Sequence, residues 1–485
     1  MGVEPPRLVI DCAENKSYIA LSYCWGEPQL ITLTARSLDI FKEGIDMQIL
    51  PRTIQDAITV TRGLRQQYLW VDALCIFQDD EDAKARDISE MHDIYKNAFL
   101  TICASSASRC SEGFLMNFTE RFPIAIRVPF HLPGRVAGTI ILREQLTINR
   151  SKQAPLDLRA WTYQEGTLSP RNLIFDWIVY LQCCKRPMTP AELRPSSSFP
   201  EYEEFTGARI WKTRMEPDLA SIEDNLRLST IKAHDRWKDD IDEYTRRTMT
   251  NERDKLPAFA GLAIQFTRQT GFHYLAGLWR ETLLVDLLWQ VSAFDRGPRL
   301  QTRRAPSWSW ASIDGTIDTS SLRQYLSADS VDSRYSELPF VLEILTVLCT
   351  PVFEDAIYGE NLQGIIRVKG YLVPVHYVGK ASTSEEFEAR LLELDGRSPT
   401  VHSIDLRVKL DTTDDLASAE LHPEYWALPV LTSLYNAGLI LSQYSPGLFR
   451  RIGHFDEHWK QGPRSITSNS KSWQAMWKPA ILDIM

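Results

Sequence analysis

The sequence predicts an α/β domain at the N-terminus, followed by a helical segment and a β-rich C-terminal region. Short apolar runs alternate with 3.6-residue helical patterns over roughly the first 185 residues, as in a parallel sheet that is covered on both faces. Helical spacing prevails from about residue 205 to residue 292, and apolar strand-like runs return after Ala305. These three stretches define the expected fold class.

Each element of the N-terminal domain has a local signal. Strands are expected where apolar and β-branched residues run together and stop at a turn, and helices where apolar residues recur every three or four positions. The expected elements are, in order, a strand at 19–24, a helix at 53–64, a strand at 68–76, a helix around 88–98, a strand at 99–104, an inserted hairpin within 122–150, a helix at 156–168 and a strand at 172–175.

The domain organisation follows from shifts in composition. Residues 15–185 form the expected α/β domain, and a stretch rich in Pro and Ser at 186–204 is interpreted as a linker. Residues 205–300 are predicted to be a helical segment and residues 301–485 a β-rich region.

Composition excludes several function classes. The chain has 485 residues, and 54 Lys and Arg against 63 Asp and Glu give a net charge of −9, which argues against a nucleic-acid partner. The first residues lack a signal peptide pattern, and no apolar run reaches the roughly 18 residues that span a membrane. The 8 cysteines include no CxxC pair, so we expect a cytoplasmic protein without a metal site, a cofactor or a membrane span.

Five separated blocks of sequence have residue combinations that general hydrophobic and turn patterns do not account for. They are YIALSYCWG at 18–26, LPRTIQDA at 50–57, YLWVDALCIFQDD at 68–80, MHDIYKNA at 91–98 and RAWTYQEGTLSPR at 159–171. In this order they resemble the fungal heterokaryon-incompatibility (HET) domain, and the resemblance covers roughly residues 15–185.

The resemblance implies a role in fungal non-self recognition and in programmed cell death. It also implies a distant relationship to TIR domains, which have a flavodoxin-like parallel sheet, signal by self-association and in some branches hydrolyse NAD. On this basis we expect a homo-oligomer on activation, a protein trigger, and NAD as a candidate substrate. The region downstream of the domain brings no assigned function with it.

The carboxyl ends of the predicted strands are where a ligand would gather in an open parallel sheet. They present Ser22, Tyr23, Cys24, Trp25, Gly26, Asp72, Ser105 and Ser106. Tyr23 or Trp25 could stack on a nucleobase while Gly26 lets the backbone approach closely, or both rings could simply pack at the strand exit. Asp72 could bind a ribose hydroxyl, or accept hydrogen bonds from a helix N-terminus or an arginine.

The helix at 156–168 carries the strongest candidate for chemistry. TIR enzymes have a Trp-Cys-x-x-Glu motif on the corresponding helix, with a catalytic Glu. Trp161 and Glu165 match its spacing, and Thr162 stands in place of the Cys. The resemblance therefore implies that Glu165 is catalytic and that Trp161 lines the site. Alternatively, Glu165 caps a helix or pairs with Arg159 or Arg171.

Beside a catalytically unrelated regulator that keeps only the fold, two functions stay open from the sequence. In the first, Glu165 stabilises the positive charge that develops when the nicotinamide–ribose bond of NAD breaks. In the second, the chain is a non-enzymatic, self-associating signalling or scaffold module. Cys75 and His92 are interpreted as an inert buried thiol and a helix residue rather than as a nucleophile and its base.

Overall fold

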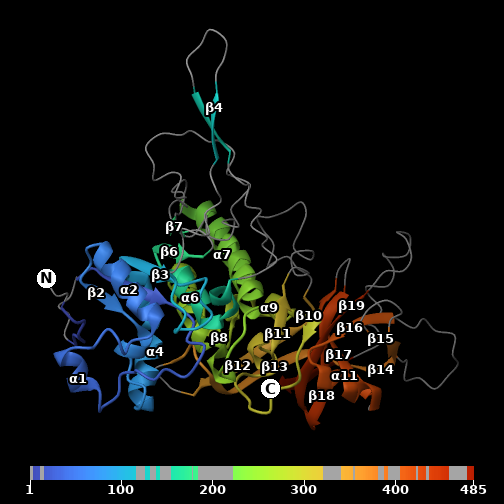
Figure 1. The fold of residues 1–485 in the computed structure, drawn as a ribbon. Coiled ribbons are helices and arrows are strands. Elements are labelled where there is room, and N and C mark those ends of the chain that lie inside the picture. Colours follow the sequence, from blue (N-terminus) through green and yellow to red (C-terminus); the bar gives the residue numbers. More distant parts are fainter. Residues whose placement is uncertain are drawn as a thin grey trace. The chain divides into compact units, whose positions relative to one another are not determined.

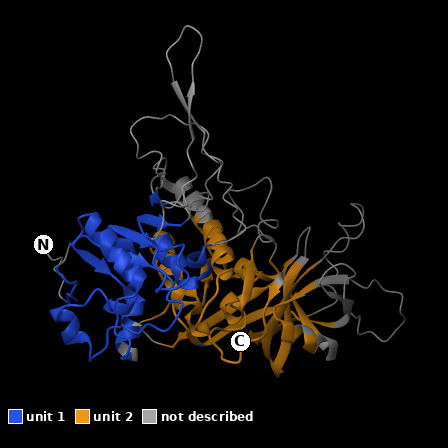
Figure 2. Cartoon of the chain, in the orientation of Figure 1, with its two compact units in different colours: residues 1–216 blue, residues 217–485 orange. Residues whose placement is uncertain are grey.

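A computed structural model gives the structure of the chain. It describes residues 4–10, 16–115, 126–130, 138–142, 154–176, 179–183, 222–319, 340–352, 356–380, 387–391, 405–421, 424–432, 436–457 and 478–485. The chain divides into two compact units, residues 1–216 and residues 217–485 (Figure 2). The expected linker at 186–204 lies outside the described residues.

The first unit is built on a five-stranded sheet in the order β2-β1-β3-β6-β7 (Figure 1). Its strands are β1 (Tyr18–Ser22), β2 (Tyr68–Trp70), β3 (Leu100–Cys103), β6 (Arg171–Phe175) and β7 (Val179–Cys183). β2, β1, β3 and β6 are mutually parallel, as the sequence predicts. β7 was not predicted, and it pairs antiparallel with β6.

Helices cover both faces of this sheet. On one face, α1 (Leu38–Glu43) and α2 (Arg52–Gly63) contribute Phe41, Ile54, Ala57 and Ile58 to the larger core. The three- and four-residue spacing of the α2 residues places them on one side of the helix. On the other face lie α4 (Glu81–Asn97), whose N-terminus is capped by the Asp80 carboxylate, and α6 (Ala160–Leu168).

The alternation of side chains along β1 separates these two faces. Ile19, Leu21 and Tyr23 belong to the core beneath α1 and α2, whereas Ala20 and Cys24 belong to clusters on the side of α4 and α6. Because successive side chains of a strand point to opposite faces, Ser22 also faces α4 and α6.

Two predicted elements of this unit are wrong in their extent. The strand expected at 68–76 ends at Trp70, and α3 (Asp72–Cys75) begins two residues later. The Asp72 carboxylate accepts the N–H of Ala73 at 2.6 Å, a local bond that competes with strand pairing. The helix expected at 156–168 is split into a 3-10 turn, η1 (Pro155–Leu158), and α6, because Arg159 is extended.

The hairpin expected within 122–150 is confirmed. β4 (Ile126–Phe130) pairs antiparallel with β5 (Gly138–Leu142), and Val128 lies opposite Ile140. The hairpin is inserted between β3 and α6 in the chain. Residues 116–125 and 131–137, which flank and connect its strands, lie outside the described residues.

The second unit begins with helices, as predicted, but strands interrupt the helical segment before residue 300. The helices are α7 (Ile222–Thr245), α8 (Ala260–Thr270) and α9 (Leu283–Asp286), with the 3-10 turns η4 (Glu252–Lys255), η5 (Pro257–Phe259) and η6 (Arg280–Thr282). β8 (Tyr274–Leu275) pairs with β9 (Leu278–Trp279), and β10 (Gln290–Arg296) pairs with β11 (Gly315–Asp318). The sequence 305–312, expected to open the β-rich region, contains instead the 3-10 turn η7 (Trp310–Ser312).

The rest of the second unit is β-rich, in agreement with the prediction. Nine strands form one sheet in the order β12-β13-β20-β19-β16-β15-β14-β17-β18, and an additional pairing of β18 with β19 closes six of them into a ring. The strands are β12 (Glu343–Pro351), β13 (Asn361–Tyr371), β14 (Val373–Lys380), β15 (Phe387–Leu391), β16 (Asp405–Leu410), β17 (Glu424–Thr432), β18 (Asn436–Ser445), β19 (Leu448–Glu457) and β20 (Pro479–Ile484). A short helix, α11 (Thr413–Leu421), follows β16.

Candidate functional site

Glu165 on α6 is hydrogen-bonded to Ser22 at the end of β1. The Ser22 hydroxyl donates to Oε2 of Glu165 at 2.5 Å. Both side chains are buried, Ser22 with 1% and Glu165 with 6% of its surface exposed. Two residues that are 143 positions apart in the chain therefore meet at the carboxyl end of β1, an inner strand of the sheet.

This pair lies within a polar layer between α6 and the sheet. The hydroxyls of Thr101 and Ser169 bond each other at 2.6 Å, and Ser169 also donates to the Glu165 carbonyl at 2.7 Å. The Asn172 amide donates to the Gly166 carbonyl at 2.8 Å. Buried polar groups are costly unless they are hydrogen-bonded, so a helix that packs through such a layer is held in a specific position.

Burial controls the charge of Glu165. It raises the pKa of the carboxyl to about 7, against the hydrogen bond from Ser22, which lowers it. The negative charge of Asp72 raises the pKa further, and the positive charge of Arg159 lowers it. Near neutral pH the side chain therefore exists in both protonation states, which is a property of groups that exchange protons or stabilise developing charge.

A second group of the predicted residues gathers on the other side of the β1 exit. The Trp25 indole Nε1 donates to Oδ2 of Asp72 at 2.8 Å. Burial raises the pKa of Asp72, and the N–H groups of Trp25 and Ala73 oppose that rise. Burial likewise raises the pKa of Tyr23, and the negative charge of Asp72 raises it further.

Both groups lie at the point where the strand order of the sheet reverses. The chain passes from β1 to β2 on one side of β1, and then from β2 to β3 on the other side. In open parallel sheets this position, beyond the carboxyl ends of the strands, is where ligands bind. The structure thus brings Ser22 to Glu165 and Trp25 to Asp72 at the edge of the sheet where a ligand is expected.

Two predicted site residues contact protein groups rather than an open site. Trp161 is partly buried against the cluster that includes Ile76, Met91 and Tyr95. Gly26 has φ +73°, and a Cβ atom there would lie 2.6 Å from Cγ and 2.8 Å from Cα of Arg109. A glycine is therefore needed at this position because the backbone lies close to Arg109.

The predicted alternatives for Glu165 can be compared with the structure. Arg171 donates to the Phe99 carbonyl at 2.8 Å, and its guanidinium carbon lies 5.1 Å from the centre of the Phe99 ring. Arg159 donates to the Tyr23 carbonyl at 3.4 Å. Its positive charge lowers the pKa of Glu165. The Ser22 hydroxyl donates a hydrogen bond to the Glu165 carboxylate.

Three residues near Glu165 were given no role in the site by the sequence analysis. Cys24 and Cys103 lie in one small cluster on the α6 side of the sheet, and the Tyr95 hydroxyl donates to the Leu21 carbonyl at 3.0 Å. The period-two alternation from Ser22 to Cys24 is a signal that could have placed Cys24 on this face. For Tyr95, the sequence signal was only its position on the apolar face of a predicted helix, which does not reveal a place near Glu165.

Substitution of Gly26 by alanine is expected to destabilise the first unit by about 2 kcal/mol or more, because a non-glycine residue is strained at positive φ and its Cβ meets Arg109. Urea unfolding of the full chain measures the effect. Gly63→Ala is the matched control, since a Cβ on this helical glycine meets nothing within 4 Å and should stabilise the chain slightly. Equal stability of Gly26→Ala and wild type would contradict the expectation.

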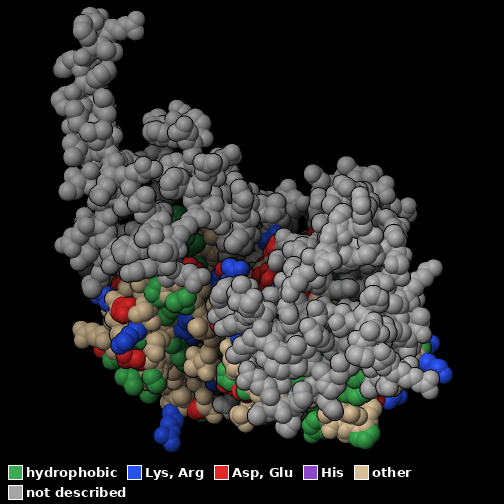
Figure 3. Space-filling model, turned by 90° about the vertical axis from the view of Figure 1, so that its right-hand side faces the viewer, with side chains coloured by type: hydrophobic (Ala, Val, Ile, Leu, Met, Phe, Trp, Pro, Cys, Tyr) green, Lys and Arg blue, Asp and Glu red, His purple; other side chains and the backbone are tan. Residues whose placement is uncertain are grey.

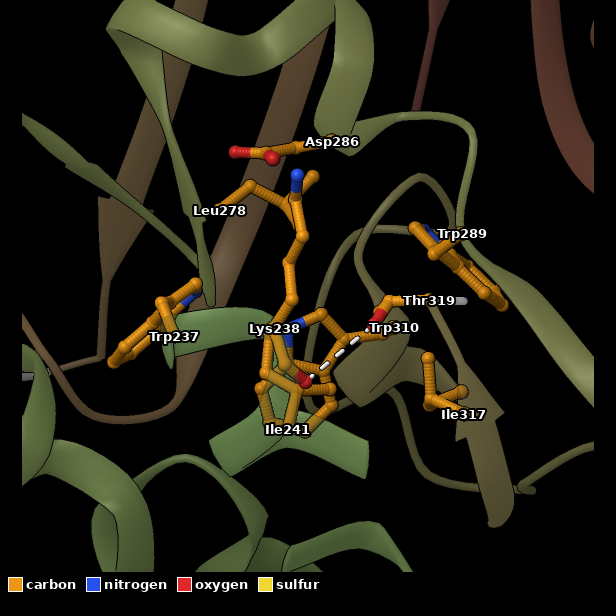
Figure 4. A pocket seen from close by; sticks show the side chains of 9 residues that line it. All are labelled: Trp237, Lys238, Ile241, Leu278, Asp286, Trp289, Trp310, Ile317 and Thr319. Atoms are coloured by element: carbon orange, nitrogen blue, oxygen red, sulfur yellow. Dashed lines mark hydrogen bonds between the residues drawn. The ribbon is translucent and has the colours of Figure 1, made fainter. Parts of the chain in front are cut away.

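The second unit contains a small cavity, drawn in Figure 4. Its lining includes the rings of Trp237, Trp289 and Trp310, and the Lys238 side chain points toward Asp286. The Asp286 carboxylate is bonded by His234 at 2.8 Å and by the Thr282 hydroxyl at 2.7 Å. The cavity has room for about one water molecule, so it is a packing feature and too small for a metabolite.

The surface and the remaining side chains add few further candidates. On the face drawn in Figure 3, acidic, basic and apolar side chains of the described residues are interspersed. Within the described ranges, no three His, Cys, Asp or Glu side chains come together as a metal site. In the same part of the chain, no helix is both long enough and apolar enough to cross a membrane.

Residues 18–165 match the family model described as heterokaryon incompatibility protein (HET). The first unit contains a HET domain. The matched segment runs from the first residue of β1 to Glu165 on α6, so both members of the Ser22–Glu165 hydrogen bond lie within the HET domain.

A curated relative supports the same assignment. Heterokaryon incompatibility protein 6, OR allele, of Neurospora crassa is 32% identical over an alignment of 93 residues, and the match covers 17% of this chain and 13% of the relative. The chain therefore matches only a small part of that protein's length. No solved structure matches the chain.

Proposed function

We propose that this chain is a fungal heterokaryon-incompatibility effector that promotes programmed cell death, and that its HET domain hydrolyses NAD at the Glu165 site. The observation that carries the proposal is the buried Glu165 carboxyl, held by Ser22 at the strand-order reversal of a parallel sheet. The order β2-β1-β3-β6 agrees with the flavodoxin-like arrangement over its four parallel strands, which supports a TIR-like fold.

The chemistry of NAD cleavage suits a carboxylate in this position. The bond between ribose C1′ and the nicotinamide nitrogen breaks, and its electron pair leaves on nicotinamide, which becomes neutral. The ribose carbon then carries oxocarbenium character, and a nearby carboxylate stabilises this charge. A water oxygen adds to C1′ and releases one proton to solvent, so the products are nicotinamide and ADP-ribose.

The ionisation of Glu165 predicts the pH dependence of this reaction. The carboxylate form stabilises the positive charge, and burial raises the pKa of this carboxyl to about 7. The rate should therefore fall as the pH drops below about 7, where Glu165 becomes protonated.

The enclosure of Glu165 connects the chemistry to activation. With 6% of its surface exposed, the side chain is enclosed, and in our proposal the segment that follows β1 moves to admit a substrate. We propose that self-association of the HET domain, set off by a protein trigger, supplies this movement. Trp25 and Asp72 lie on that segment and on the helix beside it, which makes them the ligand-binding residues of the opened site.

NAD loss in the purified full chain tests the proposal. We expect wild-type protein at high concentration, with a crowding agent, to consume NAD, and Glu165→Gln to lower the rate about 100-fold or more. Glu43→Gln is the matched control, because Glu43 is an exposed glutamate on α1 of the same unit. Ser22→Ala should lower the rate by a smaller factor, since it removes the hydrogen bond but leaves the carboxylate.

One observation favours a second function. Glu165 is buried and hydrogen-bonded, as expected of a residue that holds α6 on the sheet of a non-enzymatic, self-associating signalling or scaffold module. Absence of NAD loss in a folded chain that assembles by light scattering would contradict catalysis and favour this module. NAD loss that persists in Glu165→Gln would remove Glu165 from the reaction.

A further inference from the structure

The Ser22 hydroxyl lies directly against the Glu165 side chain. Its Oγ is 2.5 Å from Oε2 of Glu165 and donates a hydrogen bond to it. Both side chains are buried. A hydroxyl at this distance from a carboxyl group has its proton acceptor already in place, which is the arrangement of an activated oxygen nucleophile.

The sheet fixes the position of Ser22. It is the last residue of β1, and it lies opposite Cys103 in the parallel pairing with β3. Its carbonyl accepts a hydrogen bond from the N–H of Ala104 at 3.0 Å. The backbone of Ser22 is therefore anchored on a rigid element, and its short side chain keeps the hydroxyl oxygen beside Glu165.

Other hydroxyls around Glu165 are arranged differently. The Ser169 hydroxyl donates to the backbone carbonyl of Glu165 at 2.7 Å rather than to its side chain. The Tyr95 hydroxyl acts on the Glu165 carboxyl, but it donates to the Leu21 carbonyl at 3.0 Å. Of these three hydroxyls, that of Ser22 has the geometry of a nucleophile beside its base.

The proposed function brings an electrophilic carbon to this position. When the nicotinamide–ribose bond breaks, C1′ of the ribose develops positive charge in front of Glu165. Because Ser22 Oγ is 2.5 Å from the carboxyl oxygen that stabilises this charge, a short displacement brings it to the attack distance of about 3–3.5 Å from C1′. Ser22 and water therefore compete for the same carbon.

We propose that Ser22 is a second acceptor of the ribosyl group: in a fraction of the turnovers its hydroxyl oxygen, rather than water, bonds to C1′, and the chain becomes ADP-ribosylated on Ser22. This inference rests on the proposed function. The bond from C1′ to the nicotinamide nitrogen breaks and its electron pair leaves on nicotinamide, while the C1′–Oγ bond forms. The hydroxyl proton passes to Glu165 along the existing hydrogen bond and from there to solvent. The attached group then fills the space in front of Glu165, so each modified chain is inactive and the activity limits itself.

Mass spectrometry of the full chain after incubation with NAD tests the proposal. Wild type at high concentration with a crowding agent should gain the mass of one ADP-ribosyl group, and peptide fragmentation should place it on Ser22. The rate of NAD loss should decline in proportion to the modified fraction. Ser22→Ala should gain no such mass, and its lower initial rate should not show this decline. Free ADP-ribose in place of NAD should leave Ser22 unmodified, because it lacks the nicotinamide leaving group.

Ser108→Ala is the matched control for the loss of a serine that is bonded to a glutamate. The Ser108 hydroxyl donates to the Glu112 carboxylate at 2.8 Å, but this pair is exposed and lies in the segment after β3. The Ser108→Ala chain should be modified on Ser22 and should consume NAD as wild type does.

The outcomes separate this proposal from the proposed function. NAD loss by a wild-type chain that stays unmodified, or that carries the group on Tyr95 or another residue, overturns the role of Ser22 and leaves NAD cleavage standing. Absence of NAD loss in a folded chain that assembles overturns both. The mapping on wild type decides the question even if Ser22→Ala does not fold.

Discussion

Replacing Arg451 by alanine is expected to destabilise the second unit by about 3–5 kcal/mol, the effect of removing one partner from a buried ion pair. Arg451 on β19 has no exposed surface. Its Nε bonds the Asp411 carboxylate at 3.1 Å, and its two terminal nitrogens donate to the carbonyls of Leu287 at 2.6 Å and Trp289 at 2.5 Å. Alanine leaves the Asp411 charge and both carbonyls buried without these bonds.

Urea unfolding of the full chain, followed by tryptophan fluorescence, measures this loss, because the guanidinium carbon of Arg451 lies 3.4 Å from the centre of the Trp289 ring. The double variant Arg451→Met with Asp411→Leu should recover more than half of it, since no charge is then left unpaired. Lys369→Gln is the control, because its ion pair with Glu343 is exposed and is worth about 0–1 kcal/mol. A loss below about 1 kcal/mol for Arg451→Ala would show that the pair does not hold the unit together.

Glu165→Gln is expected to make the chain more stable than wild type above pH 7, by up to about 3 kcal/mol. Burial raises the pKa of Glu165 from 4.5 to about 7. The folded protein therefore binds a proton that the unfolded chain has released between these two pH values, and wild type loses stability as the pH rises through this window. Glutamine is always neutral and still accepts a hydrogen bond from Ser22, so it does not lose that stability.

Thermal or urea unfolding of both proteins at pH 5 and pH 8 measures this difference. The two proteins should be close in stability near pH 5 and clearly separated at pH 8, while Glu43→Gln follows wild type at both. If wild type were the more stable protein at pH 8, the cost of burying the Glu165 charge would be more than offset by hydrogen bonds and neighbouring positive charge, and the expectation would be wrong. A stability gain that coincides with loss of NAD cleavage would show that the carboxylate is kept for its chemistry at the expense of stability.

Much of the candidate site could be predicted from residues near one another in the chain. Ser22, Tyr23, Trp25 and Asp72 were expected at the carboxyl ends of strands, and the structure places them at that edge of the sheet. Glu165 came from a motif resemblance, and its hydrogen bond to Ser22 could not be predicted because it joins two distant segments. Arg159 was considered only as a partner that pairs with Glu165, whereas in the structure it donates a hydrogen bond to the Tyr23 carbonyl.

The elements that the sequence misplaced share one cause. The strand expected to continue through Asp72 ends earlier because the Asp72 carboxylate bonds the adjacent N–H, and the helix expected at 156–168 breaks at the extended Arg159. Both breaks depend on a single residue within an otherwise favourable pattern. The unpredicted β7 is added to the sheet by pairing with β6, and a pattern of five residues does not reveal which edge it joins.

The sequence by itself determined the α/β class of the first unit, its parallel strands, its inserted hairpin and the β-rich character of the second. These depend on hydrophobic periodicity, which is local and repeats every two or 3.6 residues. Only the tertiary structure decided that Ser22 meets Glu165, that β18 pairs with β19 to close a ring, and that Asp411 neutralises Arg451. Contacts of this kind join residues far apart in the chain. They form only where packing brings their segments together and offsets the conformational entropy that is lost when the segments become ordered.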